Sequence, residues 1–253
     1  MVRTARHAGS AGLAYVLEGI VQNGGFCAAA WLMIAVWARG TAPTGRASRR
    51  EIAAAALCLL ALVPSRQASI AGLIALGVQL AGLRGTGTGR RVAALLLALA
   101  LNLGWTSPYV LPLHAAVARL DARAVQALLH LVGVGARGGG NLVDSGSAGF
   151  GIEILARCAS SYPFGGVCLA FIVTMLYQGR MPGRHDLPWR AASLLASMGL
   201  TELRLSWMTL READFMWLHD GGGVTLYSLA GSALAALFPL LAARRGTARR
   251  SEP

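Results

Sequence analysis

The fold is decided by a stretch in which the connection RGTGTGRR (84–91) leads into VAALLLALALNLGW (92–105). Three arginines stand before a run whose only polar side chain is Asn102. Long apolar runs separated by short charged loops are typical of membrane-spanning helices. The stretch therefore indicates a membrane protein if the same alternation recurs in the rest of the chain.

The alternation continues in both directions. Apolar runs occupy 11–38 (cleanest at 26–38), 52–64, 69–83, 92–105, 163–178, 191–208 and 222–243. Several are shorter than the ~20 residues that cross a bilayer, so flanking residues must extend them or the membrane must be locally thin. The pattern predicts an all-α polytopic integral membrane protein with about seven transmembrane helices, or eight if the first run is two pieces.

Composition excludes other classes. The chain has 253 residues, of which 55% are hydrophobic and 13% charged, with 23 basic residues (all Arg) against 11 acidic ones. A disordered basic tail would contain far less apolar sequence, and 4 cysteines are too few for a disulfide scaffold of this length. Aromatic residues make up only 7%, and the charges are not interleaved with polar residues as in nucleic-acid binders. We expect no nucleic-acid partner.

Charge placement predicts the orientation. Fourteen of the 23 arginines fall in 39–50, 84–91, 180–190 and 244–250, which are alternate connections. By the positive-inside rule these segments are cytoplasmic and the other connections are outside. The expected location is the plasma (inner) membrane, crossed many times. The side of the N-terminus stays open, and a cleaved signal peptide is not expected because Glu18 interrupts the first apolar run.

The longest outer connection, 106–157, has two halves. The spacing of apolar residues predicts an amphipathic helix over 117–134 that lies on the membrane surface. After three glycines, 141–143 and 151–157 read as two short strands around a turn at 144–146. The chain thus divides into N-terminal transmembrane helices (1–105), this helix and β-hairpin (106–157), a transmembrane core (158–243) and a basic cytoplasmic tail (244–253).

Three reactive side chains fall near the outer face in this topology. Cys158 opens one apolar run, Arg204 stands where the next one ends, and His219 precedes the last. An imidazole can take a thiol proton and return it to a leaving amine, and a guanidinium can stabilise a thiolate or an oxyanion. Each also has a plain structural interpretation, as a small apolar residue, an interfacial anchor or an interfacial histidine.

The residues around these three carry a family resemblance. The segments GNLV (140–143), GIEILARCAS (151–160), TELR (201–204) and HDG (219–221) resemble the exosortase/archaeosortase family of polytopic membrane cysteine proteases and transpeptidases. The resemblance extends over about 120–243. It implies a catalytic triad of Cys158, Arg204 and His219. It also implies membrane-tethered protein substrates whose C-terminal sorting signal is a short motif, one membrane helix and a basic tail.

The chain departs from the family pattern at three points. The family commonly has Cys-Ser-Gly at the nucleophile, where this chain has Cys158-Ala159-Ser160, and Asn-x-x-Arg, where this chain has TELR (201–204). The aromatic residue that often follows the histidine stretch is absent after Gly223. These differences bear on the substrate motif, because all three triad positions are filled.

Weaker candidates surround the triad. Asp220 is a candidate to orient His219. Ser161 and Tyr162 follow Cys158 by three and four residues, so on a continuous helix they would share its face and either line a peptide groove or pack. Glu202 is expected to be a buried partner of an arginine.

We expect neither a metal nor a cofactor, because His114, His130 and His185 show no metal-ligand spacing. Two rival functions remain. One is a non-catalytic membrane protein such as a transporter or assembly subunit. The other is a membrane acyl or glycosyl transferase, although the acids form no obvious catalytic pair in the sequence.

Overall fold

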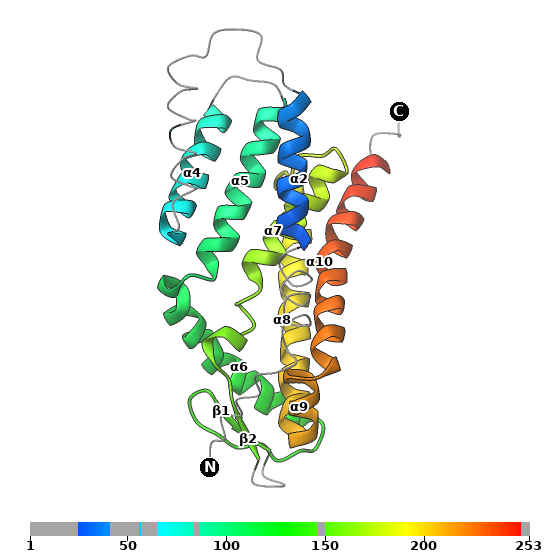
Figure 1. Cartoon of the computed structure of the whole chain (residues 1–253). Coiled ribbons are helices and arrows are strands. Elements are labelled where there is room, and N and C mark those ends of the chain that lie inside the picture. Colours follow the sequence, from blue (N-terminus) through cyan, green and yellow to red (C-terminus); the bar gives the residue numbers. More distant parts are fainter. Residues whose placement is uncertain (1–24, 41–55, 57–64, 83–86, 146–149, 249–253) are drawn as a thin grey trace.

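The computed structural model of the chain describes residues 25–40, 56, 65–82, 87–145 and 150–248. Figure 1 shows an elongated helical bundle with a two-stranded hairpin at one end. The long helices are α2 (Gly25–Gly40), α4 (Arg66–Gly82), α5 (Gly87–Trp105), α6 (Leu111–Leu131), α7 (Phe164–Tyr177), α8 (Leu187–Leu210) and α10 (Gly222–Ala248). The predicted helical architecture with a small hairpin is confirmed.

The shorter elements gather at the turns of the bundle. They are the 3-10 helices η2 (Pro108–Val110), η3 (Ala156–Cys158) and η4 (Arg184–Asp186), the short helix α9 (Glu212–His219), and the strands β1 (Leu142–Asp144) and β2 (Gly151–Glu153). The strands pair antiparallel, with Val143 opposite Ile152. The second strand ends at Glu153 rather than at the predicted Arg157, because the chain tightens into η3 just before the loop that leads to α7.

The apolar runs predicted most of the helices, with shifted boundaries. The helix predicted over 117–134 begins at Leu111, because Pro112 near its start suits a first helical turn. Helix α9 was not predicted, since its residues mix acids with aromatics and show no apolar stripe. Outside the described residues lie the predicted runs at 11–24 and 52–64 (apart from Ala56), Leu83 at the end of the third run, the turn residue Gly146, and the arginines at 46–50, 84 and 249–250.

Helices α5 and α7 form the centre of the bundle. Helix α5 packs against α2, α4 and α7, and α7 packs against α5, α8 and α10. Their shared core includes Leu95, Leu99 and Leu169. At Gly165 the two backbones approach so closely that a Cβ would lie 2.9 Å from both Asn102 Cα and Trp105 Cβ. This contact fixes the start of α7, and with it the loop that follows Cys158.

One described helix is both long and apolar enough to cross a bilayer: Gly222–Arg245, with a mean hydropathy of 1.8. Gly87–Trp105 and Pro108–Leu131 pass the same criterion only as a pair, and they are bent by 62°. Phe26–Trp37 and Phe164–Tyr177 are apolar but shorter. By length and composition the described residues thus contain one candidate span, or two with the bent pair, and the predicted number of seven or eight stays a prediction.

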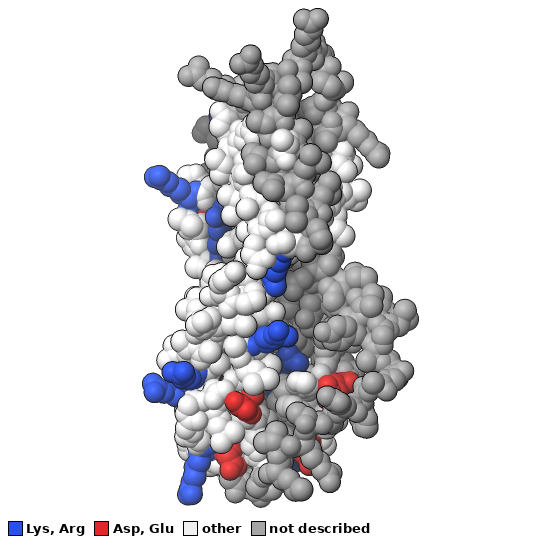
Figure 2. Space-filling model, turned by 60° about the vertical axis from the view of Figure 1, so that its left-hand side comes forward, with Lys and Arg blue, Asp and Glu red and all other residues white. Residues whose placement is uncertain are grey.

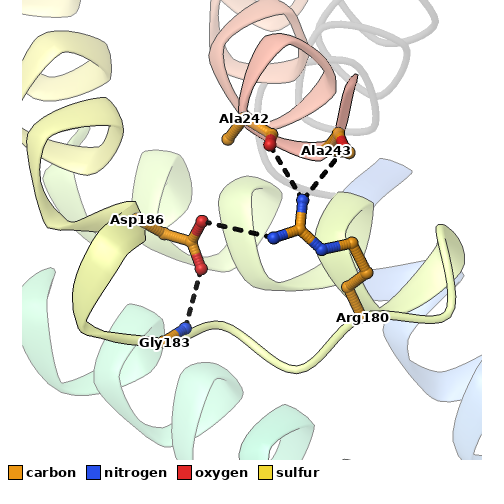
Figure 3. Close-up of polar contacts among 5 residues, drawn as sticks. All are labelled: Arg180, Gly183, Asp186, Ala242 and Ala243. Atoms are coloured by element: carbon orange, nitrogen blue, oxygen red, sulfur yellow. Dashed lines mark hydrogen bonds and ion pairs between the residues drawn. The ribbon is translucent and has the colours of Figure 1, made fainter. Parts of the chain in front are cut away.

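The end of the bundle where α10 finishes, which we call the basic end, is also where α5 begins, α7 ends and α8 begins, so it contains the described parts of the predicted cytoplasmic segments around these helix ends (Figure 1). Arg180 donates to the backbone oxygens of Ala242 and Ala243, at 2.8 and 3.0 Å, and lies 3.8 Å from the Asp186 carboxylate (Figure 3). Asp186 in turn accepts the N–H of Gly183 at 2.7 Å. The α7–α8 connection is thereby tied to the end of α10.

Other arginines at the basic end pack on tryptophan. The Arg245 guanidinium lies 4.9 Å from the Trp189 ring centre, and that of Arg91 lies 5.8 Å from Trp37. Arg91 also donates to the backbone oxygen of Gly179. These contacts join α5 to α2 and α10 to α8.

The opposite end is closed by a cap built from α6, the hairpin, η3 and α9. Its core, separate from that of the bundle, contains Val125, Leu129, Val143, Ile154 and Leu218. On the face in view in Figure 2, the acidic side chains lie mainly in the lower part of the molecule, where the cap is. The three candidate catalytic residues all belong to the cap or to the helix ends beneath it.

Candidate functional site

Cys158 is the last residue of η3 and is held from both sides. Before it, Ile154 is fixed to Asn141 by two bonds, from the Ile154 N–H to the Asn141 backbone oxygen and from Asn141 Nδ2 to the Ile154 oxygen, both 2.9 Å. After it, Ser160 is fully buried and bonded to Asp121 of α6. The thiol is half-buried between these anchors. The prediction that Cys158 opens a membrane helix is wrong: α7 begins only at Phe164, after a loop.

Arg204 projects from α8 towards α9 and α10. Its Nη2 donates to the backbone oxygen of Leu218 at 2.8 Å, and its guanidinium carbon lies 4.4 Å from the centre of the Tyr227 ring. The Tyr227 hydroxyl is itself bonded to Thr201 at 2.9 Å, which holds the ring in place. Among the described residues Arg204 forms no ion pair with an acid. Its positive charge is therefore available to other groups.

The Cys158 thiol is one of those groups. Burial raises the pKa of the Cys158 thiol above its ordinary value, and the charge of Arg204 and a backbone hydrogen bond at Leu155 oppose this rise. Burial prevails, so at neutral pH the group is a thiol rather than a thiolate. The structure thus brings Cys158 and Arg204 within electrostatic reach, and the thiol needs a base before it can act as a nucleophile.

His219 closes α9 in the same corner of the molecule. It follows Leu218, whose backbone oxygen binds Arg204. Its ring stacks on Phe215, with centres 4.8 Å apart, and its Nδ1 lies 2.9 Å from Asp220 Oδ1. Phe215 and Cys158 both pack against the core of the cap. Among the hydrogen bonds of the described residues, none joins the imidazole to the Cys158 thiol.

The His219–Asp220 bond realises the contact predicted for Asp220. When Nδ1–H donates to the carboxylate, Nε2 is left as the basic nitrogen, which is the tautomer a general base requires. The turn that follows is tight: a Cβ at Gly221 would lie 2.9 Å from the Trp217 oxygen, and one at Gly223 would lie 2.8 Å from Trp217 Cε3. Glycine at both positions lets the chain enter α10 directly after His219.

Ser161 and Tyr162 do not share a helix face with Cys158, because they lie in the loop before α7. Ser161 is buried, its hydroxyl lies 2.9 Å from His114 Nδ1, and its backbone oxygen accepts a bond from Trp105 Nε1. Tyr162 packs edge-on against His114 and lines a small cavity of about 100 Å³. The two predicted alternatives were packing and lining a peptide groove. Ser161 packs in the interior, whereas Tyr162 also lines a cavity.

Glu202 has a carboxyl partner where the sequence predicted an arginine. Its side chain hydrogen-bonds to Asp121 of α6. Sequence reasoning missed Asp121, although a signal was present. Ala118, Ala122, Val125 and Leu129 form the buried stripe of α6, and Asp121 is an acid on that stripe with 3% of its surface exposed.

A cavity of about 570 Å³ lies beside Arg204, between α6, α8, α9 and α10. Its walls are apolar except at Arg204, Ser206 and Tyr227, and they include Leu128, Leu203, Trp207, Trp217 and Leu226. The rings of Trp207 and Trp217 lie 6.0 Å apart. The volume falls within the roughly 300–1,000 Å³ of ligand sites. Arg204 is thus shared by the cavity wall and the surroundings of the thiol.

Within the described residues, no group of three or more His, Cys, Asp or Glu side chains is placed to hold a metal ion. Comparison with protein-family models, with curated proteins and with solved structures found no match.

Proposed function

We propose that the protein is a polytopic membrane cysteine endopeptidase or transpeptidase that cleaves the C-terminal sorting signals of exported proteins. The observation that carries this proposal is the half-buried Cys158 thiol within reach of Arg204, whose charge no acid neutralises among the described residues. His219, with Nδ1 bonded to Asp220, supplies a base in the same corner. The resemblance of the segments around these residues to exosortases supplies the substrate class.

In the proposed reaction each of the three residues has its own role. His219 Nε2 takes the thiol proton, and Cys158 Sγ attacks the carbonyl carbon of the scissile peptide. Arg204 donates to the resulting oxyanion. The C–N bond breaks as His219 returns the proton to the leaving amine. Water or an acceptor amine then attacks the thioester, which releases the thiol. Because His219 stacks on Phe215 in the free protein, substrate binding must bring its ring towards Cys158.

The apolar cavity beside Arg204 suits the membrane helix of such a substrate. Its rim carries exposed apolar side chains from two helices, including Leu203 (62% exposed) and Leu226 (60%). A substrate helix packed on this rim would present its outer end to Arg204 and Cys158. Binding there would also exclude water from the reacting atoms.

We further propose that the bundle crosses the plasma membrane about seven or eight times, with the basic end in the cytoplasm and the cap outside. Exposed apolar side chains along the helices support a lipid surround, among them Leu32 (66%), Val78 (58%) and Leu195 (65%). The arginine and tryptophan contacts at the basic end are of the kind found at membrane interfaces.

The test of the proposal is the processing of a candidate substrate in the native host by Cys158→Ala. We expect the C-terminal helix of the substrate to remain attached. Cys168→Ala is the matched control, because Cys168 is also half-buried but lies within α7. It should process normally. Processing by Cys158→Ala at the normal rate would overturn the nucleophile assignment.

A second function is favoured by one observation, namely that His219 is bonded to Asp220 and not to the thiol. On that alternative the protein is a non-catalytic transporter or assembly subunit, and its polar side chains line a cavity. It predicts that modification of Cys158 by a thiol reagent leaves the protein's function unchanged, whereas the peptidase would be inactivated.

A further inference from the structure

A buried acid lies beside the proposed nucleophile. Asp121 Oδ2 accepts the backbone N–H of Ser160 at 2.7 Å, and Oδ1 accepts the Ser160 hydroxyl at 2.8 Å. Asp121 is 3% exposed and Ser160 is fully buried. Both oxygens of the carboxylate thus hold the residue that stands two positions after Cys158.

Glu202 completes the cluster from α8. Two carboxyl groups can share a hydrogen bond only when one of them carries a proton. Because both oxygens of Asp121 already accept bonds from Ser160, the proton belongs to Glu202. Glu202 Oε2 is buried and accepts no hydrogen bond from the described residues, which is tolerable for a neutral acid and costly for an anion.

We propose that Asp121 and Glu202 are positioning residues, which tie the Cys158 loop to the turn of α8 that carries Arg204. Glu202 and Arg204 are two residues apart on that helix, so Glu202 faces Asp121 while Arg204 faces Leu218 and Tyr227. The pair therefore fixes the position of the Cys158 loop relative to α8 and the rotation of α8 about its axis. A displacement of about 1 Å between reacting groups can cost about 100-fold in rate. The catalytic consequence rests on the proposed function.

The test separates two isosteric changes. Glu202→Gln keeps a neutral donor towards Asp121, so we expect processing within about threefold of the parent. Asp121→Asn places an amide N–H₂ against one of the two Ser160 donors, and we expect a loss of about 30-fold or more. Glu202→Leu removes the donor and should lose activity that Glu202→Gln retains. Glu212→Gln, on the exposed start of α9, is the control.

A second readout separates this inference from the proposed function. The rate at which a maleimide labels Cys158 in the purified full-length protein reports loop position without any substrate. We expect Asp121→Asn and Glu202→Leu to change this rate by more than about fivefold and Glu202→Gln to leave it unchanged. If Asp121→Asn does not fold, Ser160→Ala takes its place, because it removes one of the two bonds to Asp121.

Two results would overturn the inference. One is an unchanged labelling rate in all the disruptive variants that fold. The other is a loss in Glu202→Gln as large as in Glu202→Leu, which would show that a neutral donor towards Asp121 does not suffice. Continued processing by Cys158→Ala would remove the proposed function while the labelling comparison still decided the positioning role.

Discussion

Arg180 and Arg204 lie at opposite ends of the bundle and make similar contacts with different consequences. Each guanidinium donates to backbone oxygens of a neighbouring helix, those of Ala242 and Ala243 for Arg180 and that of Leu218 for Arg204. Arg180 also faces the Asp186 carboxylate, whereas Arg204 faces an aromatic ring and its charge acts on the Cys158 thiol. A guanidinium with a carboxylate partner serves mainly to join helices. One without such a partner keeps a field that can act on a reacting group.

The largest effect should come from Arg204→Lys. Lysine keeps the charge but loses the planar set of donors that binds the Leu218 oxygen and an oxyanion at once. We expect substrate processing to fall about 100-fold or more, with thermal stability nearly unchanged. Processing is measured by mass spectrometry of the substrate's C-terminus. Near-normal processing by Arg204→Lys would reduce Arg204 to a helix anchor like Arg180.

Arg180→Gln should have the opposite effect to Arg204→Lys, lowering stability and leaving activity unchanged. It removes the donors to Ala242 and Ala243 and leaves the buried Asp186 without its cation, so we expect a loss of about 1–3 kcal/mol in the free energy of unfolding. The rate of processing per folded molecule should stay the same. Thermal unfolding in detergent is the measurement, and Arg184→Gln, exposed in the same connection, is the control. Unchanged stability in Arg180→Gln would contradict its role as a clamp.

The sequence predicted much of the bundle because apolar runs and their arginine-bearing connections are local signals. It predicted helices at 92–105, 163–178 and 222–243, and in the structure the first begins five residues earlier and the last ends five residues later. It also predicted the hairpin before Cys158. It did not predict α9 or the turn at η3. Both depend on tertiary packing against the cap core, and neither shows a regular spacing of apolar residues in its sequence.

The candidate site was only partly predictable for the same reason. Cys158, Arg204 and His219 were selected by chemistry and topology, and the structure brings the first two together with the third in the same corner. The Asp121–Glu202 contact joins residues far apart in the chain. An acid on the buried stripe of α6 signalled that Asp121 has a partner, but its identity depended on how α6 packs against α8.

The most direct test of the account is the labelling rate of Cys158, measured against pH with a membrane-impermeant thiol reagent applied from outside the cell. The other cysteines are first replaced by alanine. We expect labelling from outside, at a rate that rises through the alkaline range because the pKa of the buried thiol is raised. Arg204→Gln should move the profile to higher pH, because the cation that favours the thiolate is gone. A thiol that does not label from outside, or a profile that Arg204→Gln leaves unchanged, would contradict the account.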